Sequence, residues 1–326
     1  MRKFCILFGP ALAAMAQDWS VMGQGSVRVV ESTVTFTYAL QPKQLGLVAR
    51  PASPDMARLT RLRFRIKADH DTAVAVLLSE KKPGGGNYTA IVWAPADVWQ
   101  QVELTPADFS VSDGPNDPAD ADGNLDLEAV EGVGIADVAQ FFLSQPENPD
   151  FPIVINRETG EHKMEIDHFE LLTTGGSPKH VGIDQFDRGF LEWITLGGIR
   201  MKLAEPENPL KMPALEARYE QGREKYPLLL RRVANFDLSK AKRLAFDIAS
   251  EQEVTMIVSL ETKSGQRFTT TIFPPGKREV FHVSLSLAEF EGPGRLDPTQ
   301  LKAIALADIT SSGESNTIWL GKVETH

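Results

Sequence analysis

Carboxylates gathered on one turn-rich segment are the residues whose type and spacing most directly suggest chemistry. Residues 113–126 read DGPNDPADADGNLD. Calcium prefers oxygen ligands, and Gly123 would allow the backbone to bend around the ion. The segment therefore predicts a calcium site with three candidate ligands, Asp120, Asp122 and Asp126.

The spacing of this acidic segment is not that of an EF-hand. If Gly123 is placed at the glycine position of that loop, Pro118 falls where the first aspartate should be and Ala129 where the bidentate glutamate should be. A solvated acidic loop without an ion is the alternative. The matching segment in the second half of the chain, residues 291–295, is compressed to EGPGR, so a calcium site would be confined to the first half.

Aromatic side chains beside the glycine-rich residues 84–86 form a second candidate site. Sugar rings are commonly held by stacking on flat apolar surfaces, while a few polar groups fix their orientation. We therefore predict Tyr88 and Trp93 as stacking residues and Asn87 as a polar partner. On a regular strand Tyr88 and Trp93 point to opposite faces, so the alternative is that one of them belongs to the core. Trp99 is predicted to pack in the core.

The histidines suggest no metal site. His162 and His168 share strand parity, but they lie too far apart along an extended strand to bind one metal ion. Asn316 and Lys322 occupy the matching positions in the second half of the chain. We therefore expect surface histidines without a ligand role.

Sequence motifs of the common catalytic classes are missing. The chain has no Gly-x-Ser-x-Gly turn, no phosphate-binding loop and no His-Glu-x-x-His helix. Paired carboxylates for glycoside hydrolysis come together in space rather than in sequence, so their spacing does not reveal them. The sequence predicts a non-catalytic protein, with a glycan-active enzyme as an alternative.

The elements that must position these residues occur twice. Residues 61–66 (RLRFRI) correspond to residues 243–248 (RLAFDI), and residues 125–138 correspond to residues 296–309. Self-similarity on this scale indicates two tandem domains, because the repeats of a solenoid are much shorter.

A domain division is predicted near residue 176. Residues 173–178 (TTGGSP) have the small, turn-forming composition of a short linker. The division yields a first domain at residues 17–175 and a second at residues 176–326, each long enough to bury its own core.

Short runs of β-branched and aromatic residues dominate the chain, separated by Gly, Pro, Asn or Asp. Residues 214–224 have helical composition but align with residues 34–38 of the first copy, so we predict a strand there as well. In the first half the predicted strands are residues 27–30, 33–38, 62–66, 74–78, 88–93, 99–104, 141–143 and 164–172. Many short strands without long helices predict an all-β fold of two tandem jelly-roll β-sandwich domains.

Charge and the N-terminal residues restrict the partners. A formal net charge of −10 argues against nucleic acid, which requires a concentrated basic surface. Residues 1–16 combine a basic start, a short apolar run and small residues, which predicts a cleaved signal peptide, a secreted or periplasmic protein and no membrane span. Cleavage would remove Cys5, the only cysteine. An incorrectly assigned start followed by a buried strand is the alternative.

The order of the elements resembles the galactose-binding-like group, and in particular the complex I intermediate-associated protein family and the carbohydrate-binding jelly rolls. The likeness covers nearly the whole mature chain, once per copy. It is carried by an opening Trp19 with Gly23 and Gly25, a Leu-x-Phe-x-Ile strand, Trp99-x-x-Val102-x-Leu104, Asp108-Phe109, an acidic loop before Leu125-Asp126, and a closing EIDHF at residues 165–169. These motifs form cores, so the resemblance implies the fold more strongly than a ligand.

The leading hypothesis is a secreted, non-catalytic protein that binds a polysaccharide or glycan through its first domain. A protein-interaction or assembly factor of the complex I intermediate-associated type is the first alternative, and its partner would be another protein. A glycan-active enzyme is the second. Calcium is the only cofactor that the sequence suggests.

Overall fold

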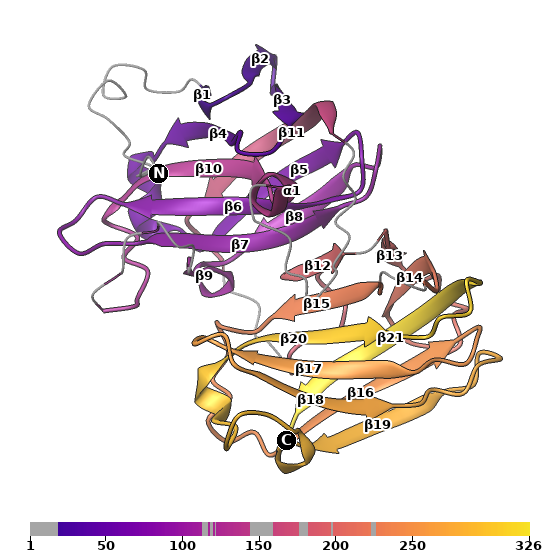
Figure 1. The fold of residues 1–326 in the computed structure, drawn as a ribbon. Helices are drawn as coiled ribbons and strands as arrows, with labels where there is room; N and C mark the ends of the chain where they lie inside the picture. The colour runs from indigo at the N-terminus through magenta and orange to yellow at the C-terminus, as the bar shows by residue number, and fades with distance from the viewer. Residues whose placement is uncertain are drawn as a thin grey trace. The chain divides into compact units, whose positions relative to one another are not determined.

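The chain folds into two compact units in the computed structural model (Figure 1), which describes residues 19–112, 117, 120, 122–143, 159–175, 182–196, 198–222 and 226–326. The first unit holds strands β1 to β11 and the second holds strands β12 to β21. The predicted signal peptide lies outside the described residues, as do parts of the predicted linker and of the acidic segment. Within the described residues, no helix has the length and apolar character needed to cross a bilayer.

The first unit is a sandwich of two antiparallel sheets. The β5 strand pairs with β11 and β8, and β6 pairs with β10 and β7. In sheet order, the first sheet is β1 (Ser20–Gly23), β4 (Gly46–Pro51), β10 (Val130–Asp137), β6 (Thr72–Glu80), β7 (Asn87–Ala94) and β9 (Ser110–Val111). The second is β2 (Ser26–Val30), β3 (Thr33–Leu40), β11 (Gly160–Leu172), β5 (Arg61–Ala68) and β8 (Gln100–Leu104).

The second unit repeats this plan. Its first sheet is β12 (Trp193–Leu196), β15 (Leu228–Arg232), β20 (Leu301–Asp308), β17 (Met256–Thr262) and β18 (Arg267–Ile272). Its second is β13 (Arg200–Leu203), β14 (Ala214–Glu220), β21 (Ser315–Thr325), β16 (Arg243–Ser250) and β19 (Phe281–Ser286). The predicted fold class, all-β with two jelly-roll sandwiches, is therefore confirmed, and so is the strand predicted from residue 214 onward.

In the described residues, helical structure is limited to short elements. They are α1 (Ala139–Leu143) and the 3-10 turns η2 (Pro54–Arg58), η3 (Pro106–Asp108), η4 (Leu287–Glu289) and η5 (Pro298–Gln300). The prediction of a strand at residues 141–143 was wrong. The Asp137 carboxylate accepts the Ala139 N–H at 2.7 Å, which favours a helical turn, and Phe141 packs against a small cluster of Leu47, Ala49 and Ala136.

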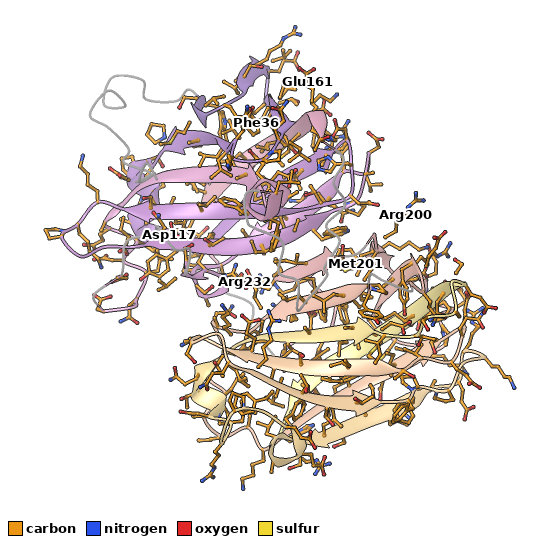
Figure 2. All side chains as sticks on the ribbon, in the orientation of Figure 1. Phe36, Asp117, Glu161, Arg200, Met201 and Arg232 are labelled. Atoms are coloured by element: carbon orange, nitrogen blue, oxygen red, sulfur yellow. The ribbon has the colours of Figure 1, made fainter. Side chains whose placement is uncertain are left out.

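The core follows from the alternation in the sequence. Along β5, Leu62, Phe64 and Ile66 are buried while the intervening arginines are partly exposed. Phe36 on β3 is also fully buried, whereas Glu161 on β11 lies at the surface (Figure 2). Burying each such apolar side chain contributes about 1.5–3 kcal/mol, so alternation is the main source of stability in both sandwiches.

The two units also match in which residues pair across neighbouring strands. His162 pairs with Tyr38 across β11 and β3, as Asn316 pairs with Tyr219 across β21 and β14. Both long strands also carry a bulge where they pair with β5 or β16, and the residues His168 and Lys322 there have positive φ angles of 51° and 28°. The correspondence of His162 with Asn316 and of His168 with Lys322 is thus confirmed.

Candidate functional site

Tyr88 and Trp93 do not present open rings. Their exposed fractions are 2% and 4%, and β7 is buried along its whole length. Tyr88 lies opposite Leu78 and Trp93 opposite Ala73 on β6, so the two rings are on opposite faces as parity requires. The sequence predicted both as stacking residues, with one of them in the core as the alternative, and both are buried. Their positions therefore do not support the predicted stacking role.

Asn87 and Tyr88 instead belong to a polar cluster at one end of β7. The Asn87 side chain accepts from the Ser79 hydroxyl at 2.8 Å and donates to Asp117 Oδ1 at 3.2 Å. The Tyr88 hydroxyl donates to Asp120 Oδ2, and this bond is the largest cause of the lowered pKa of Asp120. The structure thus brings Asn87, Tyr88 and Asp120 together at the end of the strand.

A lysine lies among the predicted calcium ligands. Lys82 Nζ is 3.7 Å from Asp122 Oδ2, 3.7 Å from Asp126 Oδ2 and 3.5 Å from Glu80 Oε2. An ammonium group supplies positive charge to carboxylates that would otherwise repel one another. The calcium site remains a prediction, and an ion there would have to compete with Lys82.

A better candidate surface is the outer face of the β2-β3-β11-β5-β8 sheet. We call it the charged face and define it by Arg61, Arg63, Arg65, Lys67, Gln101, Glu103, Glu165 and Asp167, together with Trp99. Residues two apart on a strand share a face, so these side chains all lie on the same side of the sheet. There they can contact side chains on the neighbouring strands. The exposed fractions of its charged side chains range from 11% at Asp167 to 39% at Arg65, so the face is partly open to solvent.

Ion pairs order the charged face. Arg61 and Arg63 each contact Glu103 at 3.0 Å, and Lys67 contacts Glu165 at 2.5 Å. Burial would raise the pKa of Glu103, but hydrogen bonds from the two arginines lower it, and the bond from Lys67 lowers the pKa of Glu165. Both carboxylates are therefore ionised at neutral pH and accept hydrogen bonds.

Trp99 stands at the edge of this array. It precedes β8 and shares parity with Gln101 and Glu103, which places it on the outer side of the sheet. Its ring centroid is 4.7 Å from the Arg65 guanidinium carbon and 5.0 Å from Lys67 Nζ. Trp99 is only partly buried, so its predicted place in the core was wrong. Parity relative to Val102 and Leu104 would have revealed this.

The matching face of the second unit is covered around Trp319. Trp319 on β21 is buried with Leu210, Ala214 and Ala249, and Met212 packs against them. The segment that contributes Leu210 is held by Asn208, whose side chain donates to the Glu205 and Met212 carbonyl oxygens at 2.7 and 2.8 Å. The second unit therefore has an apolar cluster at the position of Glu165, while Arg243, Asp247 and His282 keep a smaller polar array on the same face.

Comparisons with known proteins give distant structural likenesses. No protein-family model and no curated protein matches the chain. A family 11 carbohydrate-binding module of a cellulosomal cellulase from Clostridium thermocellum is 16% identical, with 44% of this chain and 92% of that one covered and a TM-score of 0.37.

Two further structures are similar to this chain over different lengths. A tandem family 22 carbohydrate-binding domain of a Paenibacillus barcinonensis protein is 6% identical, covers 96% of this chain and 94% of that one, and has a TM-score of 0.31. An agarase is 14% identical over 45% of this chain and 26% of its own, with a TM-score of 0.37. At these values the likenesses identify neither ligand nor activity, and the resemblance to the complex I intermediate-associated family stays a prediction.

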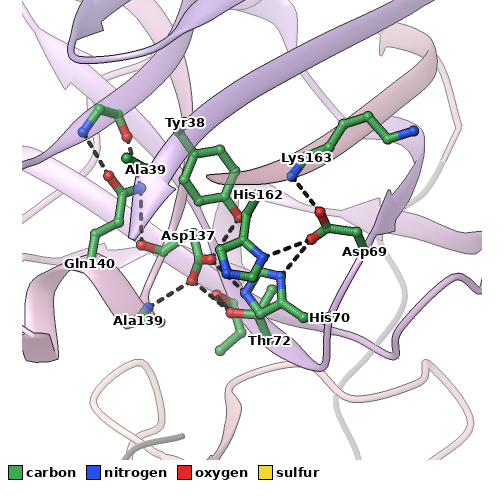
Figure 3. A network of polar contacts seen from close by, with 12 residues as sticks. Tyr38, Ala39, Asp69, His70, Thr72, Asp137, Ala139, Gln140, His162 and Lys163 are labelled. Carbon is green, nitrogen blue, oxygen red and sulfur yellow. Dashed lines mark hydrogen bonds and ion pairs between the residues drawn. The ribbon is translucent and has the colours of Figure 1, made fainter. Parts of the chain in front are cut away.

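A histidine cluster lies where β5 ends and β11 begins (Figure 3). His70 Nδ1 and His162 Nδ1 lie 2.8 and 3.1 Å from Asp69 Oδ1, and the two imidazole centroids are 4.2 Å apart. The expectation of surface histidines holds for His168, whose side chain is 61% exposed, but not for His162, at 11%. Sequence reasoning missed His70 because residues 70 and 162 are brought together only by pairing of β11 with β5.

Proposed function

We propose that the first unit is a non-catalytic carbohydrate-binding module and that its ligand lies on the charged face. The observation that carries the proposal is Trp99, a partly exposed indole beside an ordered array of charged and amide groups. A flat aromatic surface flanked by fixed hydrogen-bonding groups is the combination that a sugar ring requires.

The charges of this face favour a polyhydroxylated ligand over a highly charged one. Each of its cations lies beside a carboxylate: Lys67 beside Glu165 and Arg65 beside Asp167, while Arg61 and Arg63 share Glu103. A matched array provides little net field to attract a polyanion, yet each group can form charge-assisted hydrogen bonds with sugar hydroxyls. The pairs also hold the side chains in place, which lowers the entropy cost of binding.

We propose that only the first unit binds, and that the protein is exported. Two features of the second unit support the first point: Val280 takes the place of Trp99, and the region around Trp319 is covered. The basic and apolar residues at the start of the sequence support the second. The non-catalytic role is supported by the sequence, which has none of the common catalytic motifs.

A glycan array with the chain from Gln17 to His326 tests the proposal, run with calcium and again with a chelator. Saturable binding to a polysaccharide is expected, and Trp99→Ala should weaken it about tenfold or more, because aromatic anchors carry a large share of binding energy. Val280→Ala is the matched control, since Val280 precedes β19 as Trp99 precedes β8. It should bind like the parent chain.

Three results would change the assignment. Absence of saturable binding in both conditions would overturn the carbohydrate function. Binding that survives Trp99→Ala but is lost in Trp93→Phe would move the site to the residues predicted from sequence. Binding that a chelator abolishes would assign a ligand role to calcium at the acidic segment.

A further inference from the structure

We propose that Asp69, His70 and His162 form a binding site for one divalent first-row transition metal ion, such as Zn²⁺. One ligand atom from each of the three residues lies within 4.8 Å of the other two. The ion would join the turn after β5 to β11 (Figure 3). This site is separate from the predicted calcium site and is independent of carbohydrate binding.

The donor atoms have nearly the separation that a metal ion needs. Asp69 Oδ1 is 2.8 Å from His70 Nδ1 and 3.1 Å from His162 Nδ1. Bonds of about 2.0–2.2 Å in a tetrahedral zinc site place neighbouring donors roughly 3.4 Å apart. Each contact must therefore open by only a few tenths of an ångström for an ion to replace the protons between the donors.

Groups behind the three donors hold them in orientation. The Lys163 N–H donates to Asp69 Oδ2 at 2.8 Å, which leaves Asp69 Oδ1 facing the two imidazoles. His70 Nε2 lies 3.0 Å from Asp137 Oδ2, and Asp137 is buried. A carboxylate behind one ring nitrogen directs the other toward the metal, an arrangement that recurs in metal sites because it fixes both tautomer and ring orientation.

The chemistry and exposure of the cluster suit a transition metal better than calcium. Imidazole nitrogens select zinc, copper, nickel or iron, whereas calcium requires an all-oxygen shell. The side chains of His70 and His162 are 11% exposed and that of Asp69 is 31% exposed. Solvent therefore reaches the carboxylate side, where water can complete the coordination.

The second unit supplies a matched substitution. Asn316 occupies the position of His162 and donates to the Tyr219 hydroxyl at 3.3 Å, so an asparagine fits this register beside a core tyrosine. His162→Asn should remove one metal ligand without disturbing the sandwich. His282→Asn is the control, because His282 contacts a single carboxylate, Asp247, at 2.6 Å in the second unit.

The test is calorimetric titration of the chelator-stripped full chain with Zn²⁺, followed by Co²⁺ titration read by visible absorption. One ion per chain with micromolar or tighter affinity is expected, together with Co²⁺ bands typical of four or five ligands. His162→Asn and Asp69→Asn should each weaken Zn²⁺ binding at least tenfold, while His282→Asn leaves it unchanged. Metal-free melting curves establish that the variants are folded.

Several results would overturn the site. No saturable Zn²⁺ binding by the parent chain would mean that the cluster is held by protons alone. Equal affinity in the folded His162→Asn variant would exclude His162 as a ligand. Loss of the Co²⁺ bands in His282→Asn would place the ion in the second unit instead.

Discussion

The outer faces of two matching sheets serve different purposes on the same scaffold. In the first unit, Glu165 projects from β11 into a solvent-exposed array and pairs with Lys67. In the second, the matching residue is Trp319 on β21, which is buried under Leu210 and donates to Glu216 at 3.2 Å. The inner faces share a pattern of apolar residues, so the comparison shows that the core preserves the fold while the outer face is free to diverge.

The largest effect is expected when the side chains at the two matching positions, Trp319 and Glu165, are each truncated to alanine. Trp319→Ala should destabilise the second unit by about 3–5 kcal/mol, because it opens a cavity and removes the donor to Glu216 Oε2, whereas Arg218 still donates to Oε1. Glu165→Ala should cost the first unit under about 1 kcal/mol. Urea unfolding of the full chain measures both. Equal losses would show that the two faces are energetically alike.

The histidine cluster should make the stability of the first unit depend on pH in metal-free protein. Burial would lower the pKa of His70, but Asp137 and Asp69 outweigh it and raise the pKa from 6.5 to about 9. The stabilisation is therefore complete below pH 6.5 and is lost as the pH rises through 9. Its size is on the order of 3 kcal/mol.

Unfolding at pH 6 and pH 10 checks this dependence. His70→Gln should abolish the difference that is specific to the first unit, and the second unit provides the internal reference. A parent chain whose first unit is equally stable at both pH values would show that the folded-state pKa is not raised.

The buried tyrosine–aspartate bonds should behave alike in the two units. The Tyr38 hydroxyl donates to Asp137 at 2.7 Å, and the Tyr219 hydroxyl donates to Asp308 at 2.9 Å. Tyr38→Phe and Tyr219→Phe should each cost about 1–2 kcal/mol, because a buried acceptor loses one donor. Thermal unfolding measures both. A large loss of stability in only one of the two variants would contradict this, and would show that the tyrosine–aspartate bond contributes far more in that unit.

The smallest effect is expected on the charged face. Glu103→Gln removes the charge that Arg61 and Arg63 share, but all three side chains are partly exposed. Such pairs contribute under about 1 kcal/mol, and salt screens them. The difference in unfolding free energy between the parent chain and Glu103→Gln should therefore be smaller at high salt than at low salt. A loss above about 2 kcal/mol would mean that the array is a structural element rather than a surface.

Most strands of the first unit and the internal repeat could be predicted from the sequence. The alternation in residues 62–66 predicts a half-buried strand because side chains on a strand point alternately to opposite faces, and Leu62, Phe64 and Ile66 are indeed buried. The helix at residues 139–143 could not be predicted from composition, which favours a strand at 141–143, because the hydrogen bond between the Asp137 carboxylate and the Ala139 N–H favours a helical turn there.

The candidate sites were less accessible from the sequence than the fold. Parity separates Tyr88 from Trp93, but it does not say whether the outer side of β7 is covered. Trp99 was misplaced because tryptophan is more often buried than exposed, although its parity with Glu103, opposite to that of Val102 and Leu104, indicates the outer face.

The sequence by itself determined the all-β class, the tandem repeat and the core-facing residues, because these depend on a period of two along each strand. Only the tertiary structure decided which outer face is open and which residues meet across strands. Asp69 and His162 are 93 positions apart, and they come together because β11 pairs with β5. Contacts of this kind depend on strand order and register, which local residue patterns do not encode.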